Sequence, residues 1–271
     1  MVAHSRNGVD DRSPDQTYGS YLALEEVLGA QRPRSDEHDE MLFIVIHQVY
    51  ELWFKQLLHE LAELQRQLAA GSTAHALHTL RRVLKILEVI VAQIDVLETM
   101  TPRQFTSFRV RLEESSGFQS AQFRELEAVL GRRDEGAFAH YPEGSAAREG
   151  ILAAMSRPAL YDSFLRYLAE RGYPIPVEQL ERDVRVAAAS VPQIQQVLLS
   201  VYTDDGGPAQ VAERLVDLDE GLQEWRYRHV MMVRRTIGDK PGTGGSSGAE
   251  YLRGTLFQPL FGDLWAVRSR L

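Results

Sequence analysis

A histidine lies on the apolar face of a helix that the sequence predicts from about residue 215. Apolar residues recur there at spacings of three and four, which is typical of a buried stripe on an amphipathic helix. The stripe consists of Leu215, Leu218, Leu222, Trp225, His229, Met232 and Thr236. Apolar neighbours offer no partner to the ring nitrogens of His229, so the ring must hydrogen-bond to a buried polar group or bind a metal. The pattern alone favours a core histidine with a hydrogen-bond partner and leaves metal binding open.

A second histidine, His47, lies on a similar stripe in a helix predicted from about 40 to 68. This stripe consists of Phe43, His47, Tyr50, Phe54, Leu57, Leu61, Leu64 and Leu68. The apolar residues just before His47 predict a desolvated ring, and desolvation lowers the pKa of an imidazole and keeps it neutral at pH 7. A neutral ring can accept a proton. Two such histidines favour a buried polar ligand between the two helices.

Two further features could contact a ligand. Residues 238–248 follow the helix of His229 and contain five glycines, which let backbone amides approach a ligand closely. This stretch is neither a Walker A loop nor a dinucleotide fingerprint, and a flexible linker is the structural alternative. Arg109 ends a short helix that is predicted to begin at Thr101-Pro102. An arginine there is by default a surface residue, but one that faces a pocket could bind a carboxylate with two hydrogen bonds.

The elements that position these residues are all predicted to be helices. They cover about 17–28, 40–68, 73–100, a short stretch from 102, 121–130, 159–171, a long helix through 215–236, and 251–271. No run alternates with period two, so we expect an all-α fold of long amphipathic helices. Residues 1–16 are expected to form a disordered tail and 17–271 a single domain, in which 132–193 could be a smaller helical insertion.

The composition excludes several classes of site and partner. The chain has 271 residues, a net charge of -8 and no cysteine. The acidic balance does not favour a nucleic-acid partner. The lack of cysteine excludes disulfides, thiolate haem ligation and cysteine-based zinc sites. The first 15 residues lack an apolar signal region and no apolar run approaches the roughly 20 residues that span a bilayer, so we expect no membrane partner and a cytoplasmic protein.

Seven segments resemble the tryptophan 2,3-dioxygenase family. They are 18–22 (YGSYL), 39–48 (DEMLFIVIHQ), 51–53 (ELW), 108–109 (FR), 116–120 (SGFQS), 228–230 (RHV) and 242–248 (GTGGSSG). They follow the order of the family across nearly the whole chain. The resemblance implies a helical domain that encloses haem b. It also implies a reaction in which both atoms of O2 are inserted across the indole C2–C3 bond of L-tryptophan to give N-formylkynurenine, the first step of the kynurenine pathway.

The resemblance also implies roles for individual residues. His229 is expected to be the axial ligand of the haem iron. His47 is expected to accept a hydrogen bond from the indole N–H, while Phe43 packs on the indole ring. Arg109 and Thr243 are expected to bind the amino-acid head group of the substrate.

Four further residues complete the expected site. By resemblance, Ser116 lies at the substrate and Gly117 at the haem. Tyr18 and Tyr21 share one face of the first helix, because they are three residues apart. They could pack on the core of their own chain. The resemblance implies instead that they reach the site of a neighbouring subunit in a homotetramer.

Two departures from the family keep alternatives open. Ala23 stands where family members commonly have histidine, and 204–208 is shorter than the corresponding family segment. Both could alter the pocket rim or the subunit contact. The alternatives are an enzyme that acts on a tryptophan analogue or inserts one oxygen atom in a biosynthetic pathway, and a haem-based sensor without turnover.

Overall fold

The computed structural model describes residues 16–113, 115, 117–242 and 248–271. Every regular element in these ranges is a helix. The predicted all-α class is therefore confirmed. No helix in the described ranges is long and apolar enough to cross a membrane.

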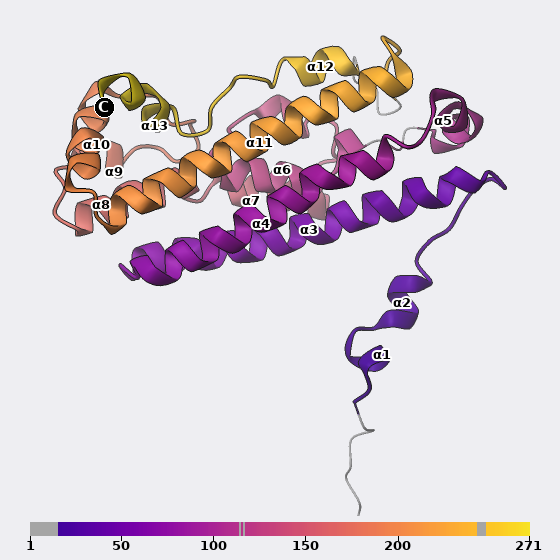
Figure 1. The fold of residues 1–271 in the computed structure, drawn as a ribbon, viewed down its shortest axis with the longest axis horizontal. Helices are drawn as coiled ribbons and strands as arrows, with labels where there is room; N and C mark the ends of the chain where they lie inside the picture. The colour runs from indigo at the N-terminus through magenta and orange to yellow at the C-terminus, as the bar shows by residue number, and fades with distance from the viewer. Residues whose placement is uncertain (1–15, 114, 116, 243–247) are drawn as a thin grey trace, which may run out of the picture.

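Three long helices form the frame of the molecule: α3 (His38–Ala69), α4 (Thr73–Leu97) and α11 (Gly207–Ile237). Both α3 and α11 pack along α4, which lies between them (Figure 1). Gly71 permits the tight turn from α3 to α4, because its φ of 64° is left-handed. At Gly221, α11 and α4 approach so closely that an added Cβ would lie 2.7 Å from a methyl group of Leu87.

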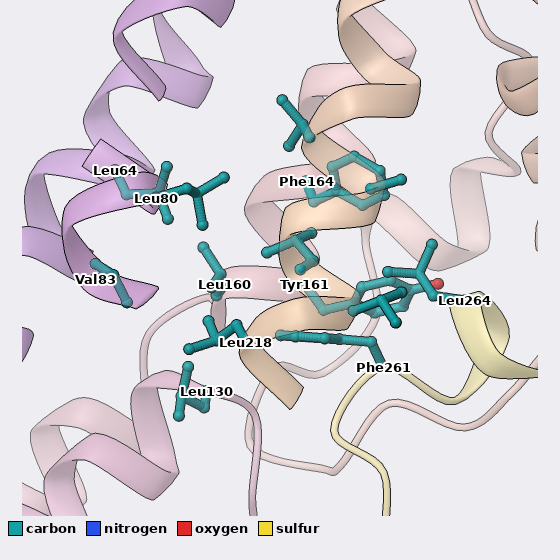
Figure 2. Close-up of a cluster of buried hydrophobic side chains, with 14 of the residues drawn as sticks. Leu64, Leu80, Val83, Leu130, Leu160, Tyr161, Phe164, Leu218, Phe261 and Leu264 are labelled. Carbon is teal, nitrogen blue, oxygen red and sulfur yellow. The ribbon is translucent and has the colours of Figure 1, made fainter. Parts of the chain in front are cut away.

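The core is densest in the half of the frame away from the N-terminus of α3. Leu64 and Leu68 on α3, Leu80 on α4 and Leu215 on α11 are fully buried there. Two further helices and the C-terminal segment close this half: α8 (Leu160–Glu170), α10 (Pro192–Asp204) and α13 (Gly262–Ala266). Figure 2 shows side chains of this core from α3, α4, α8, α11 and the C-terminal segment, together with Leu130: Leu64, Leu80, Val83, Leu160, Tyr161, Phe164, Leu218, Phe261 and Leu264. Helix α8 belongs to this core although it falls within 132–193, the predicted insertion. The division of the chain into tail, domain and insertion stays a prediction.

The other half of the frame is more open and is covered by shorter elements. They are α5 (Pro102–Arg109), α6 (Ala121–Val129), α7 (Ala146–Met155) and α12 (Ala249–Arg253), with 3-10 turns at Val110–Leu112, Gly117–Gln119 and Glu135–Phe138. Helix α9 (Val177–Leu180) packs against α8. As predicted, α5 begins at a Thr101 cap, where Thr101 and Gln104 form a reciprocal capping box.

Two predicted helices are interrupted, and those predictions were wrong. The first is divided into α1 (Tyr18–Tyr21) and α2 (Leu24–Leu28), because Ala23 has a left-handed φ of 49°. The two short helices extend away from the body as an arm (Figure 1).

The predicted helix at 251–271 consists of α12, α13 and a 3-10 turn at Val267–Arg270. Pro259 has no backbone N–H to offer a helix. Buried Asp219 on α11 accepts hydrogen bonds from the backbone N–H groups of Leu260 and Phe261, at 2.8 and 3.2 Å. These two hydrogen bonds replace the ones that Leu260 and Phe261 would make in a continuous helix.

Candidate active site

A cavity of about 220 Å³ lies in the open half of the frame. Helices α3, α4, α5, α6 and α11 contribute to its wall, together with residues on both sides of the glycine-rich loop. It gathers five of the predicted site residues: Phe43, His47, Arg109, Gly117 and His229. Ser116 and Thr243 lie outside the described residues. Tyr18 and Tyr21 are exposed on the arm and do not line the cavity of their own chain.

The ring of His47 is fixed by its own helix. His47 Nδ1 lies 2.7 Å from the carbonyl oxygen of Phe43 one turn earlier. A carbonyl oxygen can only accept, so Nδ1 carries the hydrogen and Nε2 is left as an acceptor. Burial lowers the pKa of His47, and this effect outweighs the hydrogen bond to Phe43 and the nearby Glu51, both of which raise it. The ring is therefore neutral at pH 7.

His229 lines the same cavity from α11, but in the described part of the chain its ring has no hydrogen bond comparable to that of His47. Burial, followed by the proximity of His47 and Arg124, lowers the pKa of His229 to about 4. The ring packs beside Trp225, with 5.1 Å between ring centroids. Within the described ranges, neither ring nitrogen of His229 has a hydrogen-bond partner. A core histidine would need such a partner, so the environment favours a metal ligand.

The residues around His229 fit a haem. A haem iron takes a single imidazole from the protein as its axial ligand, and the described residues contain no group of three histidines or carboxylates that could hold a bare ion. The indole Nε1 of Trp225 is buried and lacks a partner among the described residues, so a polar group of a bound cofactor could satisfy it. Aromatic rings line the rest of the wall and suit a flat apolar group: Phe54, Phe105 and Phe123.

Arg109 lies at the end of α5, beside the glycine-rich loop. Its Nη2 donates to the carbonyl oxygen of Pro241 at 2.6 Å, which ties the two segments together. A guanidinium has five N–H donors, so Arg109 keeps further donors for a carboxylate. The aromatic pocket on one side and the free donors on the other are complementary to an aromatic amino acid.

A buried ion cluster in the inner wall was missed from the sequence. Arg124 and Arg226 contact Glu127 at 2.6 and 2.9 Å, and all three side chains are almost fully buried. The spacing of Arg124 and Glu127, three residues apart in the predicted helix 121–130, is a local signal that could have been noticed. The third member lies 99 residues away in the sequence, and no local pattern indicates it.

A family model described as tryptophan 2,3-dioxygenase matches residues 3–152 and 195–271. The chain belongs to the tryptophan 2,3-dioxygenase family. The resemblance seen in the sequence is thereby confirmed.

Several relatives named tryptophan 2,3-dioxygenase are similar over nearly their full length. The protein of Anaeromyxobacter sp. (strain K) is 65% identical over 257 residues, which cover 94% of this chain and 96% of the relative. The protein of Herpetosiphon aurantiacus is 55% identical, with coverage of 94% and 98%. That of Caulobacter vibrioides is 44% identical, with coverage of 95% and 99%. The family model leaves out 153–194, which overlaps the predicted insertion at 132–193.

Proposed function

We propose that this chain is a haem-dependent dioxygenase that converts L-tryptophan and O2 to N-formylkynurenine, with His229 as the axial ligand of haem b. The observation that carries the proposal is the pair of neutral histidines on α3 and α11, which line one aromatic cavity. His47 is fixed as an acceptor, and His229 has no hydrogen-bond partner among the described residues. When bound, the haem supplies the iron chemistry that activates oxygen.

The side chains of this protein bind and orient the substrate. Nε2 of His47 accepts the indole N–H, and Phe43, whose ring centroid is 4.1 Å from that of His47, packs on the indole. Arg109 pairs with the carboxylate. By family resemblance, Thr243 and Ser116 complete the head-group contacts and Gly117 lies beside the haem. In the reaction the C2–C3 bond breaks and each carbon gains one oxygen atom, so no external reductant is consumed per turnover.

The N-terminal arm supports a homotetramer. Tyr18 and Tyr21 are 76% and 70% exposed, and the arm stands away from the body (Figure 1). Two helices of four and five residues cannot bury an apolar face by themselves. In our proposal the two tyrosines reach the site of a neighbouring subunit. The cytoplasmic location stays a prediction.

Labelled oxygen distinguishes dioxygenation from the alternatives. The ferrous enzyme, given L-tryptophan and 18O2, should form a product that contains two labelled atoms per molecule. Mass spectrometry reads this as a gain of about 36 mass units, or about 32 with ordinary O2. A single labelled atom would support insertion of one oxygen. Reversible oxygen binding without turnover of any indole would support a sensor, and turnover only of a substituted indole would support an analogue as the substrate.

Replacement of His47 should slow the reaction without abolishing it. The variant His47→Ala should lose about 100-fold in kcat/KM, because a positioned hydrogen bond or proton acceptor typically contributes on the order of 10²-fold. The matched control is His59→Ala, which removes an exposed imidazole from the same helix. Complete loss of turnover with normal haem content would show instead that His47 is an obligatory base.

The pH dependence should report the lowered pKa of His47. The ring accepts the indole N–H only when it is neutral, and its pKa in the folded protein lies below 6.5. The kcat/KM of the unmodified enzyme should therefore stay level from about pH 8 to 7 and fall at lower pH as the ring gains a proton. The fall should be absent from His47→Ala. A decline that begins above pH 7 would contradict a buried, neutral His47.

A further inference from the structure

A second cavity of about 380 Å³ lies behind the inner wall of the active site. It is bounded by residues 131–134, the start of α8, the coil at 182–188 and residues 258–260. Arg226 lines both cavities, so its ion pair with Glu127 lies between them. The proposed dioxygenase reaction makes no use of this second cavity.

Four arginines line the second cavity: Arg132, Arg133, Arg182 and Arg226. Two of them are fully engaged by the protein. Arg182 makes two hydrogen bonds to Asp162, at 2.7 and 2.9 Å, and further ones to backbone carbonyls. Arg133 donates to backbone carbonyl oxygens, including those of Val184 and Arg157. These two side chains hold the walls together and have little capacity for a ligand.

Arg132 differs from both. Its Nη1 is 3.5 Å from Glu127 Oε1 and its Nη2 is 3.7 Å from Asp134 Oδ2. A well-formed hydrogen bond between a guanidinium and a carboxylate is about 2.7–2.9 Å long. The side chain is only 20% exposed. Arg132 therefore has two carboxylate contacts, both longer than a well-formed hydrogen bond, and keeps further N–H donors on the cavity wall.

Arginines outnumber carboxylates on the wall of the second cavity, where Asp134 lies beside the four arginines. Arg132 and Arg226 share the carboxylate of Glu127, which also binds Arg124 at 2.6 Å. Burial lowers the pKa of Arg226 and the charge of Arg132 lowers it further, while Glu127 opposes both effects. Guanidinium groups that are held close together in a poorly solvated place repel one another, and a bound anion would offset this repulsion.

The remaining wall indicates what kind of anion fits. The apolar side of the cavity consists of Ala187, Ala188, Pro259 and Leu260, and Tyr161 also lines the cavity. A small inorganic anion would leave this side unfilled. The volume is in the range of cavities that hold small organic ligands, which run from about 300 to 1,000 Å³.

We propose that the second cavity is a binding site for a small organic carboxylate, whose charged end pairs with Arg132 and whose hydrocarbon body lies against Pro259 and Leu260. The carboxylate would accept two parallel hydrogen bonds from the guanidinium, which is the geometry that arginine favours. Binding requires no turnover, so the site is tested independently of the dioxygenase reaction.

The probe is 4-fluorobenzoate, titrated into the haem-loaded full-length protein and followed by 19F NMR. We expect one site with a Kd on the order of 1 mM, which suits a ligand of about ten heavy atoms. The variant Arg132→Gln should weaken binding at least tenfold. The control Arg185→Gln removes an exposed arginine that pairs with Asp183 on the same coil, and it should bind as the unmodified protein does. The neutral analogue 4-fluorobenzamide should not bind.

Two further variants distinguish binding in the second cavity from binding in the active site. Ala188→Asp adds a negative charge to the cavity wall without removing an existing hydrogen bond, and it should also weaken binding. Arg109→Ala should leave this binding unchanged, because Arg109 belongs to the other cavity. Binding that survives Arg132→Gln and Ala188→Asp but is lost in Arg109→Ala would overturn the proposal and place the probe in the active site. Absence of binding at tens of millimolar, or equal weakening by Arg185→Gln, would also overturn it.

Discussion

Tryptamine, which lacks the carboxylate of tryptophan, should be a poorer substrate by roughly 30-fold to several thousand-fold in kcat/KM. The reason is that a guanidinium left without its carboxylate in a closed site costs about 2 to 5 kcal/mol, and each 1.4 kcal/mol corresponds to a factor of ten. Among the described residues Arg109 has one hydrogen-bond partner, the carbonyl oxygen of Pro241, so its remaining donors are available to the substrate. Arg109→Ala should remove most of the discrimination and leave the haem spectrum intact.

The experiment compares two enzymes with two substrates. Steady-state kinetics of the unmodified protein and of Arg109→Ala, each with tryptophan and tryptamine, give the coupling between side chain and carboxylate directly. The control Arg111→Ala removes an exposed arginine from the adjoining 3-10 turn and should keep the full discrimination. If tryptamine reacts as well as tryptophan, or if Arg109→Ala slows both equally, Arg109 serves only to tie α5 to the loop.

Replacement of His229 should remove the haem. The variant His229→Ala deletes the one imidazole that we propose as the axial ligand, and the chain has no cysteine that could replace it. We expect the purified variant to contain little haem, to show an altered axial-ligand spectrum in any haem that remains, and to lack turnover. Added imidazole should partly restore the spectrum, because the substitution leaves a small cavity next to Trp225.

Absorption spectra and haem content per chain test this expectation. The control His78→Ala removes an exposed imidazole from α4, and it should bind haem in full. A His229→Ala protein that retains one haem per chain with an unchanged axial-ligand spectrum would contradict the assignment of His229 as the ligand.

Local sequence patterns predicted the parts of the fold that depend on residues close together in the sequence. The stripes of α3 and α11 have the helical period, and Thr101 and Pro102 are favourable at a helix start, so these elements followed from the sequence. The histidines fell on those stripes, and their placement in one cavity followed from the packing of the helices. Their catalytic roles, and those of Arg109, Thr243, Ser116 and Gly117, remain proposals.

The predictions were wrong where residues far away in the sequence determine the backbone conformation. The backbone N–H groups of Leu260 and Phe261 make no helical hydrogen bond because they donate to Asp219, about 40 positions earlier. Arg226 meets Glu127 although 99 positions separate them in the sequence. Periodicity describes one helix at a time, so it carries no information on such pairs.

The two halves of the long helices have different roles: one half forms the core and the other lines the cavity. Along α3, Leu61, Leu64 and Leu68 are at most 1% exposed, whereas Phe43 and His47 at the other end line a cavity. Helix α11 has the same division in the opposite direction, from buried Leu215 to His229. Because the fully buried leucines of α3 lie away from the cavity, residues that line the cavity can change without loss of the frame. An evolving lineage, or a protein engineer, could therefore reshape the pocket for new indoles while the distant leucines preserve the scaffold.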